Sequence, residues 1–197
     1  MNRIGIANDG RVIAMLTEDE ARRLETPPPP LDWSMPYYHV SQQGTGASLN
    51  RNDCGAACAV SIIRAHGHPD VTVDDITAIH QRPNKPMLIR EVRAALTAYG
   101  VGNDYQRPLY ADDIVGHIYA ARGVIALVDY ELLPYKAAGY ENYTWPHYIL
   151  CYAVRGDLVL YHDPLSDGRE LTITRAALDA ALVSGSGNMA NQGIVEE

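Results

Sequence analysis

The chain has 197 residues, of which 47% are hydrophobic and 20% are charged, and its formal net charge is −8. This composition predicts one ordinary globular domain with a small addition. The acidic residues are scattered, without a basic stripe or a run of like charges, which disfavours nucleic acid and anionic membranes as partners.

The first 30 residues are predicted to form an appendage. Two apolar runs within residues 4–16 flank Asp9-Gly10, a turn sequence typical of a β-hairpin. A capping box that begins at Thr17 predicts a short helix to about Leu24, and Pro27–Pro30 predict a stiff, extended spacer. The predicted division is an appendage at 1–30, a main domain at 31–183 and a mobile, Gly/Ser/Asn-rich tail at 184–197.

In the main domain, predicted helices come first and strands follow. An extended stretch at 36–42 and a polar loop lead into the first helix. Helices are predicted at 53–65, 72–80, 88–99 and 174–182, and strands at 123–129, 147–154 and 158–162. Thr72 is the expected cap of the second helix. The order predicts an α+β fold whose helical N-terminal half packs on an antiparallel sheet.

A long aromatic loop separates the first two of these strands. Residues 130–145 are rich in tyrosine and end at Trp145, and the loop is longer than most connections, which favours a functional role. We expect its aromatic side chains, Trp145 beside His147 above all, to shield that histidine or to line a substrate groove. Ordinary packing is the alternative role for each of them.

Cys54 stands at the predicted start of the first helix, with Asn52 and Asp53 as candidate caps. A helix N-terminus offers partial positive charge and free N–H groups, which favour a thiolate nucleophile. Gly55 would let a substrate main chain approach closely and leaves the N–H of Cys54 available to an oxyanion. The alternative is a small, buried structural cysteine, and this segment alone fits both interpretations.

The two strands after the aromatic loop predict a partner for Cys54. If 155–157 forms a hairpin loop, His147 faces Leu165. Asp163 is then a diagonal neighbour of His147, at roughly 7–8 Å between α-carbons, and accepts a hydrogen bond from its Nδ1–H. A structural histidine and a turn-forming aspartate are the alternatives to a catalytic pair.

The other two cysteines, Cys58 and Cys151, lie in apolar surroundings and are predicted core residues. Three cysteines do not suggest a disulfide framework, and their spacing lacks the companion ligands of a zinc site. No metal or cofactor is expected. The sequence has neither a signal-peptide-like segment nor the roughly 20 apolar residues of a membrane span. We therefore expect a cytoplasmic protein unless another export route acts on it.

Four short motifs occur in a set order along the main domain. They are Asn-Asp-Cys-Gly-Ala-Ala-Cys-Ala-Val at 52–60, Gly-Val-Ile-Ala-Leu-Val at 123–128, His-Tyr-Ile-Leu-Cys-Tyr-Ala-Val at 147–154 and Tyr-His-Asp-Pro at 161–164. Together they resemble the C39 and C39-like bacterial cysteine peptidases, over about residues 36–182. The resemblance implies a papain-like fold.

The same resemblance implies site residues. The catalytic Cys, His and Asp of the family fall on Cys54, His147 and Asp163. The family also has an upstream Gln whose side-chain amide completes the oxyanion hole. Gln42 is the candidate for it, with Gln43 as the alternative and as a candidate substrate contact.

These residues predict a cysteine peptidase that hydrolyses a peptide bond through a Cys–His–Asp triad and an acyl-enzyme. Its substrate would be a peptide or a protein. An amidase or acyltransferase that acts on peptidoglycan peptides is one alternative, and a binding module with a dormant triad is another. The sequence gives no indication of the oligomeric state.

Overall fold

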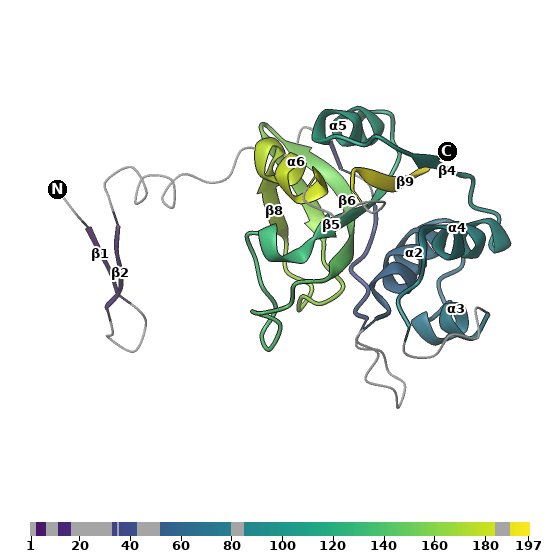
Figure 1. Ribbon diagram of the computed structural model, residues 1–197, viewed down its shortest axis with the longest axis horizontal. Coiled ribbons are helices and arrows are strands. Elements are labelled where there is room, and N and C mark those ends of the chain that lie inside the picture. The colour runs from purple at the N-terminus through teal and green to yellow at the C-terminus, as the bar shows by residue number, and fades with distance from the viewer. Residues whose placement is uncertain are drawn as a thin grey trace. The chain divides into compact units, whose positions relative to one another are not determined.

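The structure, a computed structural model (Figure 1), describes residues 36–42, 52–79, 85–183 and 190–197, and the strands at 3–6, 12–16 and 33–34. The chain divides into two compact units, Met1–Pro30 and Leu31–Glu197. In the first unit, β1 (Arg3–Ile6) pairs antiparallel with β2 (Val12–Leu16), as the predicted hairpin requires. The helix predicted at Thr17, the proline spacer and Gln43 lie outside the described residues.

Three helices gather on one side of the second unit, as Figure 1 shows. They are α2 (Cys54–Ala65), α3 (Val73–Ile79) and α4 (Ile89–Ala98), and they confirm the predicted helical half. Thr72 caps α3 as predicted, because its Oγ1 accepts a hydrogen bond from the N–H of Asp75 at 3.2 Å. Helix α2 packs against α3, α4 and the sheet, and its residues from Cys54 to Ile63 are all buried.

Within the described residues, the second unit contains a seven-stranded antiparallel sheet. The strand order is β4 (Asn103–Gln106), β9 (Gln192–Glu196), β5 (Val124–Asp129), β6 (Pro146–Arg155), β7 (Leu158–His162) and β8 (Leu171–Thr174), and β3 (Trp33–Ser34) also pairs with β6. The predicted strands are thus the middle of the sheet, whereas β4, β8 and β9 were not predicted.

Two further helices, α5 (Ala111–Tyr119) and α6 (Arg175–Val183), complete the second unit. Alternating side chains of β5 and β6 divide the core into two clusters: Ile125 and Leu150 pack with α2 and α4, and Ala126 and Ile149 pack with α5 and α6. Burial on both faces explains why β5 and β6 have continuous apolar sequences. In the described part of the chain, no helix has the length and apolar character that a membrane crossing requires.

The last strand, β9, shows that the predicted mobile tail at 184–197 is wrong for its C-terminal part. This strand pairs with β4 on one side and β5 on the other, and all five of its residues are buried. Composition reports local preferences, whereas β9 is stabilised by main-chain hydrogen bonds to strands about 70 to 90 residues earlier in the chain.

The tight packing of β9 yields a stability prediction at Gly193. A Cβ atom there would lie 2.5 Å from Cδ2 of Leu109 and 2.8 Å from the carbonyl oxygen of Ile125. We expect Gly193→Ala to lower the free energy of unfolding by about 1–3 kcal/mol, because the overpacked core must shift. Gly116→Ala, in α5, is the matched control: nothing lies within 4 Å of its new Cβ, so helix propensity should raise stability by about 0.5–1 kcal/mol. Urea denaturation measures both, and equal stability of the two variants would contradict the packing.

Candidate active site

Helix α2 begins at Cys54, with Asp53 as the N-cap residue. The main-chain carbonyl of Asp53 accepts a hydrogen bond from the N–H of Ala57 at 2.9 Å, while its side chain makes no capping hydrogen bond. The side chain of Cys54 therefore lies in the first turn of the helix, where the helix dipole favours negative charge. Cys54 is only 5% exposed.

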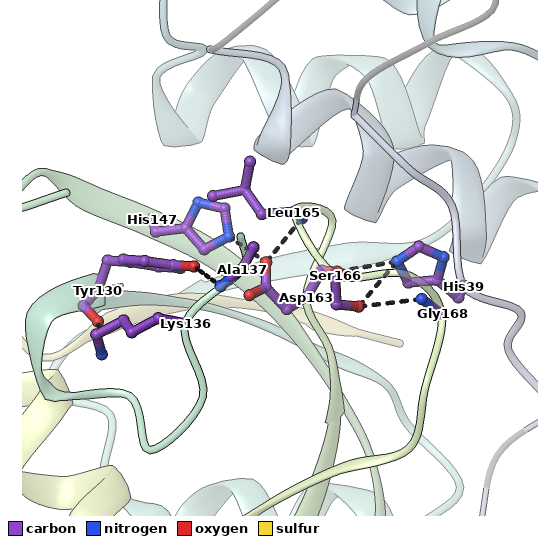
Figure 2. Close-up of polar contacts among 9 residues, drawn as sticks. All are labelled: His39, Tyr130, Lys136, Ala137, His147, Asp163, Leu165, Ser166 and Gly168. Atoms are coloured by element: carbon purple, nitrogen blue, oxygen red, sulfur yellow. Dashed lines mark hydrogen bonds and ion pairs between the residues drawn. The ribbon is translucent and has the colours of Figure 1, made fainter. Parts of the chain in front are cut away.

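His147 and Asp163 form a hydrogen-bonded pair inside the protein. His147 is the second residue of β6 and Asp163 follows the last residue of β7. Nε2 of His147 lies 2.7 Å from Oδ1 of Asp163, and the two side chains are 1% and 0% exposed. Figure 2 shows the imidazole and the carboxylate facing one another. Since a carboxylate only accepts, the histidine donates from Nε2–H.

This geometry corrects the predicted ring nitrogen. The sequence assigned the hydrogen bond to Nδ1–H, whereas the structure uses Nε2. Strand register decides which residues are neighbours, but the rotation of the imidazole decides which nitrogen points at the neighbour. His147 also makes a hydrogen bond to the side chain of Cys54. Because Nε2 bonds to Asp163, Nδ1 is the nitrogen that remains for Cys54.

The turn between β6 and β7 is one residue shorter than predicted. Arg155 pairs with Leu158, so Gly156 and Asp157 alone form the turn, and the predicted loop at 155–157 is wrong. Gly156 has a φ of 59°, in the left-handed region that tight hairpin turns use. By itself, this change would move Asp163 to the opposite face of the sheet.

A β-bulge restores the predicted pairing of the two side chains. The register of β6 shifts between Cys151 and Ala153, so that Tyr152 is an extra residue in that strand, and Cys151 pairs with Tyr161. This second shift offsets the first. Asp163 therefore reaches His147, as the incorrect turn had also predicted.

Main-chain groups of the turn after β7 orient the carboxylate of Asp163. Its Oδ1 also accepts a hydrogen bond from the N–H of Leu165 at 2.8 Å, and its carbonyl oxygen accepts one from the N–H of Ser166 at 2.9 Å. The first contact forms an Asx turn, a local arrangement that aspartate favours, and the second is the hydrogen bond of a β-turn. The turn-forming role and the pairing with His147 thus occur together in one residue.

The electrostatic surroundings favour the charged form of His147. Burial lowers its pKa, but the negative charge of the Cys54 thiolate and the hydrogen bonds to Asp163 and Cys54 outweigh burial and raise the pKa from 6.5 to about 10. The surroundings therefore favour the imidazolium form of His147. A charged imidazole beside a cysteine side chain is the arrangement in which thiol nucleophiles are activated.

Cys58 and Cys151 are buried in the apolar core. Burial raises the pKa of the Cys58 thiol well above its ordinary value, and burial raises the pKa of Cys151 to about 12. Both are core residues, as predicted from the sequence, and burial favours their neutral thiol form. In the ranges that the structure describes, no group of three or more His, Cys, Asp or Glu side chains is arranged to hold a metal.

Tyrosines of the aromatic loop surround the imidazole. The ring of Tyr130, in η1 (Tyr130–Leu132), meets His147 edge-on at 5.1 Å between ring centroids, and Tyr143 meets it at 6.4 Å. Tyr130 is held in turn by the N–H of Ala137, which donates to its hydroxyl at 2.8 Å (Figure 2). Trp145 is 69% exposed and makes no ring contact with His147 among the described contacts. The shielding role thus belongs to the two tyrosines, and a substrate contact by Trp145 stays a prediction.

The segment 36–42, before α2, brings Gln42 to the same region. Gln42 is buried, and its N–H donates to the carbonyl oxygen of Pro164, next to Asp163, at 3.0 Å. Gly55 is also buried, and a Cβ there would meet Val92 at 2.9 Å and Tyr148 at 3.1 Å. Packing of α2 therefore explains this glycine, and its predicted contact with substrate remains untested.

Comparison with solved structures identifies proteins with a similar fold. An inferred C39-like peptidase from Bacillus anthracis matches with a TM-score of 0.63 and 10% identity, over 84% of this chain and 98% of that chain. The peptidase domain of Streptococcus ComA, a bifunctional ABC transporter of a quorum-sensing pathway, matches with a TM-score of 0.55 and 11% identity, over 81% and 98%. No family model and no curated protein matches the sequence. The chain thus has the fold of C39-like, papain-like peptidases, which confirms the fold that the motifs predicted.

The charge state of His147 gives a direct test of the site. We expect the imidazole to stay protonated at about pH 8, where an ordinary histidine is neutral, and Cys54→Ala to lower its pKa because the thiolate is the largest stabilising charge. Since the folded pKa is the higher one, the pair stabilises the fold fully below 6.5 and loses that contribution as the pH rises through about 10. NMR titration of labelled histidine side chains measures this.

Cys58→Ala is the matched control for that titration. Cys58 lies one helical turn from Cys54 and is not among the groups that raise the pKa of His147. Its removal should leave the titration unchanged. A His147 that titrates near 6.5 in the wild-type chain would show that the ion pair does not form.

Proposed function

We propose that this chain is a cysteine peptidase that hydrolyses a peptide bond, with Cys54 as nucleophile and His147 as general base and acid. The observation that carries the proposal is the pair of buried contacts of His147, to Cys54 on one side and to Asp163 on the other. A nucleophile beside a base that a third group orients is the arrangement that nucleophilic hydrolases share. The peptidase names of both structural neighbours agree with it.

In the proposed reaction, the Cys54 thiolate attacks the carbonyl carbon of the scissile amide. The main-chain N–H of Cys54, at the start of α2, and the side-chain amide of Gln42 donate hydrogen bonds to the oxyanion. The imidazolium of His147 then gives its proton to the leaving amine, and a thioester forms on Cys54. His147 next removes a proton from water, which attacks the thioester and releases the acid. Asp163 holds the imidazole in position through both steps.

We propose a peptide or protein as substrate. Tyr130 and Tyr143 of the aromatic loop pack against His147, and Cys54 is only 5% exposed. In the proposal, the substrate therefore presents its scissile bond as an extended main chain between that loop and α2. Trp145, exposed at the start of β6, is the proposed side-chain contact at the edge of this path.

The nucleophile and base are tested together by variants. Cys54→Ser should abolish cleavage of a peptide library, as measured by mass spectrometry. His147→Ala should remove rapid iodoacetamide labelling of Cys54, because the thiolate loses its counter-ion. Cys58→Ala should keep both activities. Undiminished labelling of Cys54 in His147→Ala would refute the proposed pair, and transfer of the acyl group to an added amine in place of water would identify an acyltransferase.

Gln42 is tested by separating oxyanion stabilisation from nucleophile formation. We expect Gln42→Ala to lower kcat by roughly 100-fold, the usual cost of one oxyanion donor. Labelling of Cys54 by iodoacetamide should change little, because alkylation forms no oxyanion. If both rates fall by the same factor, Gln42 supports the structure of the site and does not act on the oxyanion.

A further inference from the structure

Residues 36–42, which belong to no helix or strand, are here called the strap, and they join two parts of the site. The N–H of Gln42 donates to the carbonyl oxygen of Pro164 at 3.0 Å, and the hydroxyl of Ser61 in α2 donates to the carbonyl oxygen of Tyr38 at 2.5 Å. The strap is therefore hydrogen-bonded both to the helix that begins at the nucleophile and to the turn after β7.

His39 makes the side-chain contact between the strap and that turn. Its Nε2 lies 2.9 Å from the main-chain carbonyl oxygen of Asp163 and 3.2 Å from Oγ of Ser166 (Figure 2). Because a carbonyl oxygen only accepts, Nε2 carries the hydrogen. The ring can donate this bond both as the neutral Nε2–H tautomer and as the imidazolium, so the contact does not require a particular charge state.

Residues of the turn and of β7 pack around the ring of His39. Gly168, on the far side of the turn, has a φ of 85°, and a Cβ there would lie 3.3 Å from Nδ1 of His39. The ring of His162 meets His39 edge-on at 5.9 Å, and the N–H of Gly168 donates to Oγ of Ser166 at 3.3 Å. The absence of a side chain at Gly168 thus leaves room for the imidazole of His39.

This contact acts on the residue that orients the base. The carbonyl oxygen of Asp163 accepts bonds from His39 and from the N–H of Ser166, while its carboxylate accepts bonds from His147 and from the N–H of Leu165. Main chain and side chain of Asp163 are therefore held from opposite sides. Hydrogen bonds weaken steeply with misalignment, so a shift of this main chain would weaken the bond to His147.

We propose that His39 is a positioning residue for the triad: it holds the main chain of Asp163 so that the carboxylate stays aligned with His147. The inference rests on the proposed function. It adds a fifth side chain to Cys54, His147, Asp163 and Gln42, and the described contacts of His39 are with the turn after β7 and with His162. Because Gln42 lies three residues further along the strap, the same contact also fixes the segment that carries the proposed oxyanion donor.

A pair of substitutions separates positioning from packing. His39→Leu keeps an apolar side chain but loses the donor, and His39→Gln keeps an N–H that reaches the carbonyl oxygen of Asp163. We expect His39→Leu to lower the pKa of His147 by about one pH unit, measured by NMR, and to slow iodoacetamide labelling of Cys54 roughly tenfold. His39→Gln should restore both values toward those of the wild-type chain.

Two controls accompany the pair. His68→Leu removes an exposed histidine that contacts Tyr99, away from the turn, and should leave His147 and Cys54 unchanged. The resonance of His147 is assigned by its loss in His147→Ala. This assignment is needed because the pKa of His162 should also change in His39→Leu. Burial and then the charge of His39 lower the pKa of His162, so His39→Leu should raise it.

Three outcomes of these measurements would contradict the positioning role, and they can be told apart. An unchanged His147 titration in His39→Leu, with rapid labelling of Cys54, would overturn the positioning role and leave the proposed function intact. Equal losses in His39→Leu and His39→Gln, matched by equal losses in stability to urea, would also overturn it, because the role would then be structural. If the wild-type chain itself shows neither a raised His147 pKa nor rapid labelling, the proposed function fails, and the positioning role with it.

Discussion

The central constraint in this structure is the buried hydrogen bond between His147 and Asp163, at 2.7 Å. Leaving one member of such a pair buried without its partner costs about 3–5 kcal/mol, and an apolar pair of the same size is often no less stable. The fold surrounds the pair with the N–H of Leu165, the side chain of Cys54 and the edge of the Tyr130 ring. Groups arranged at this cost are typical of a functional site.

The features of the site that could be predicted are those that local chemistry decides. Cys54 follows a capping residue, so its place at a helix start was readable from the residues around it. The alternation of side chains along two neighbouring strands indicated that His147 and Asp163 share a face. That prediction reached the correct pair through an incorrect turn, because the bulge at Tyr152 offsets the shorter loop. The face of the sheet on which a residue lies can therefore be predicted only when both the length of the turn and the position of any bulge are known.

The features that could not be predicted depend on contacts between distant segments. The polar composition of the tail concealed β9, whose partners lie in β4 and β5. Sequence patterns do not encode the rotation of an imidazole, so the ring nitrogen of His147 was assigned incorrectly. No sequence pattern indicates the contact of His39, because its partner is the main-chain carbonyl of Asp163 and not an acidic side chain.

The central claim is that Asp163 acts through His147 on Cys54, and a double-mutant cycle tests it most directly. The rate of iodoacetamide labelling of Cys54 is measured in the wild-type chain, in Asp163→Asn, in His147→Ala and in the double variant. The account predicts that Asp163→Asn slows labelling when His147 is present and has no further effect when it is absent. A slowing by the same factor in both backgrounds would contradict it, because Asp163 would then act on the nucleophile independently of the histidine.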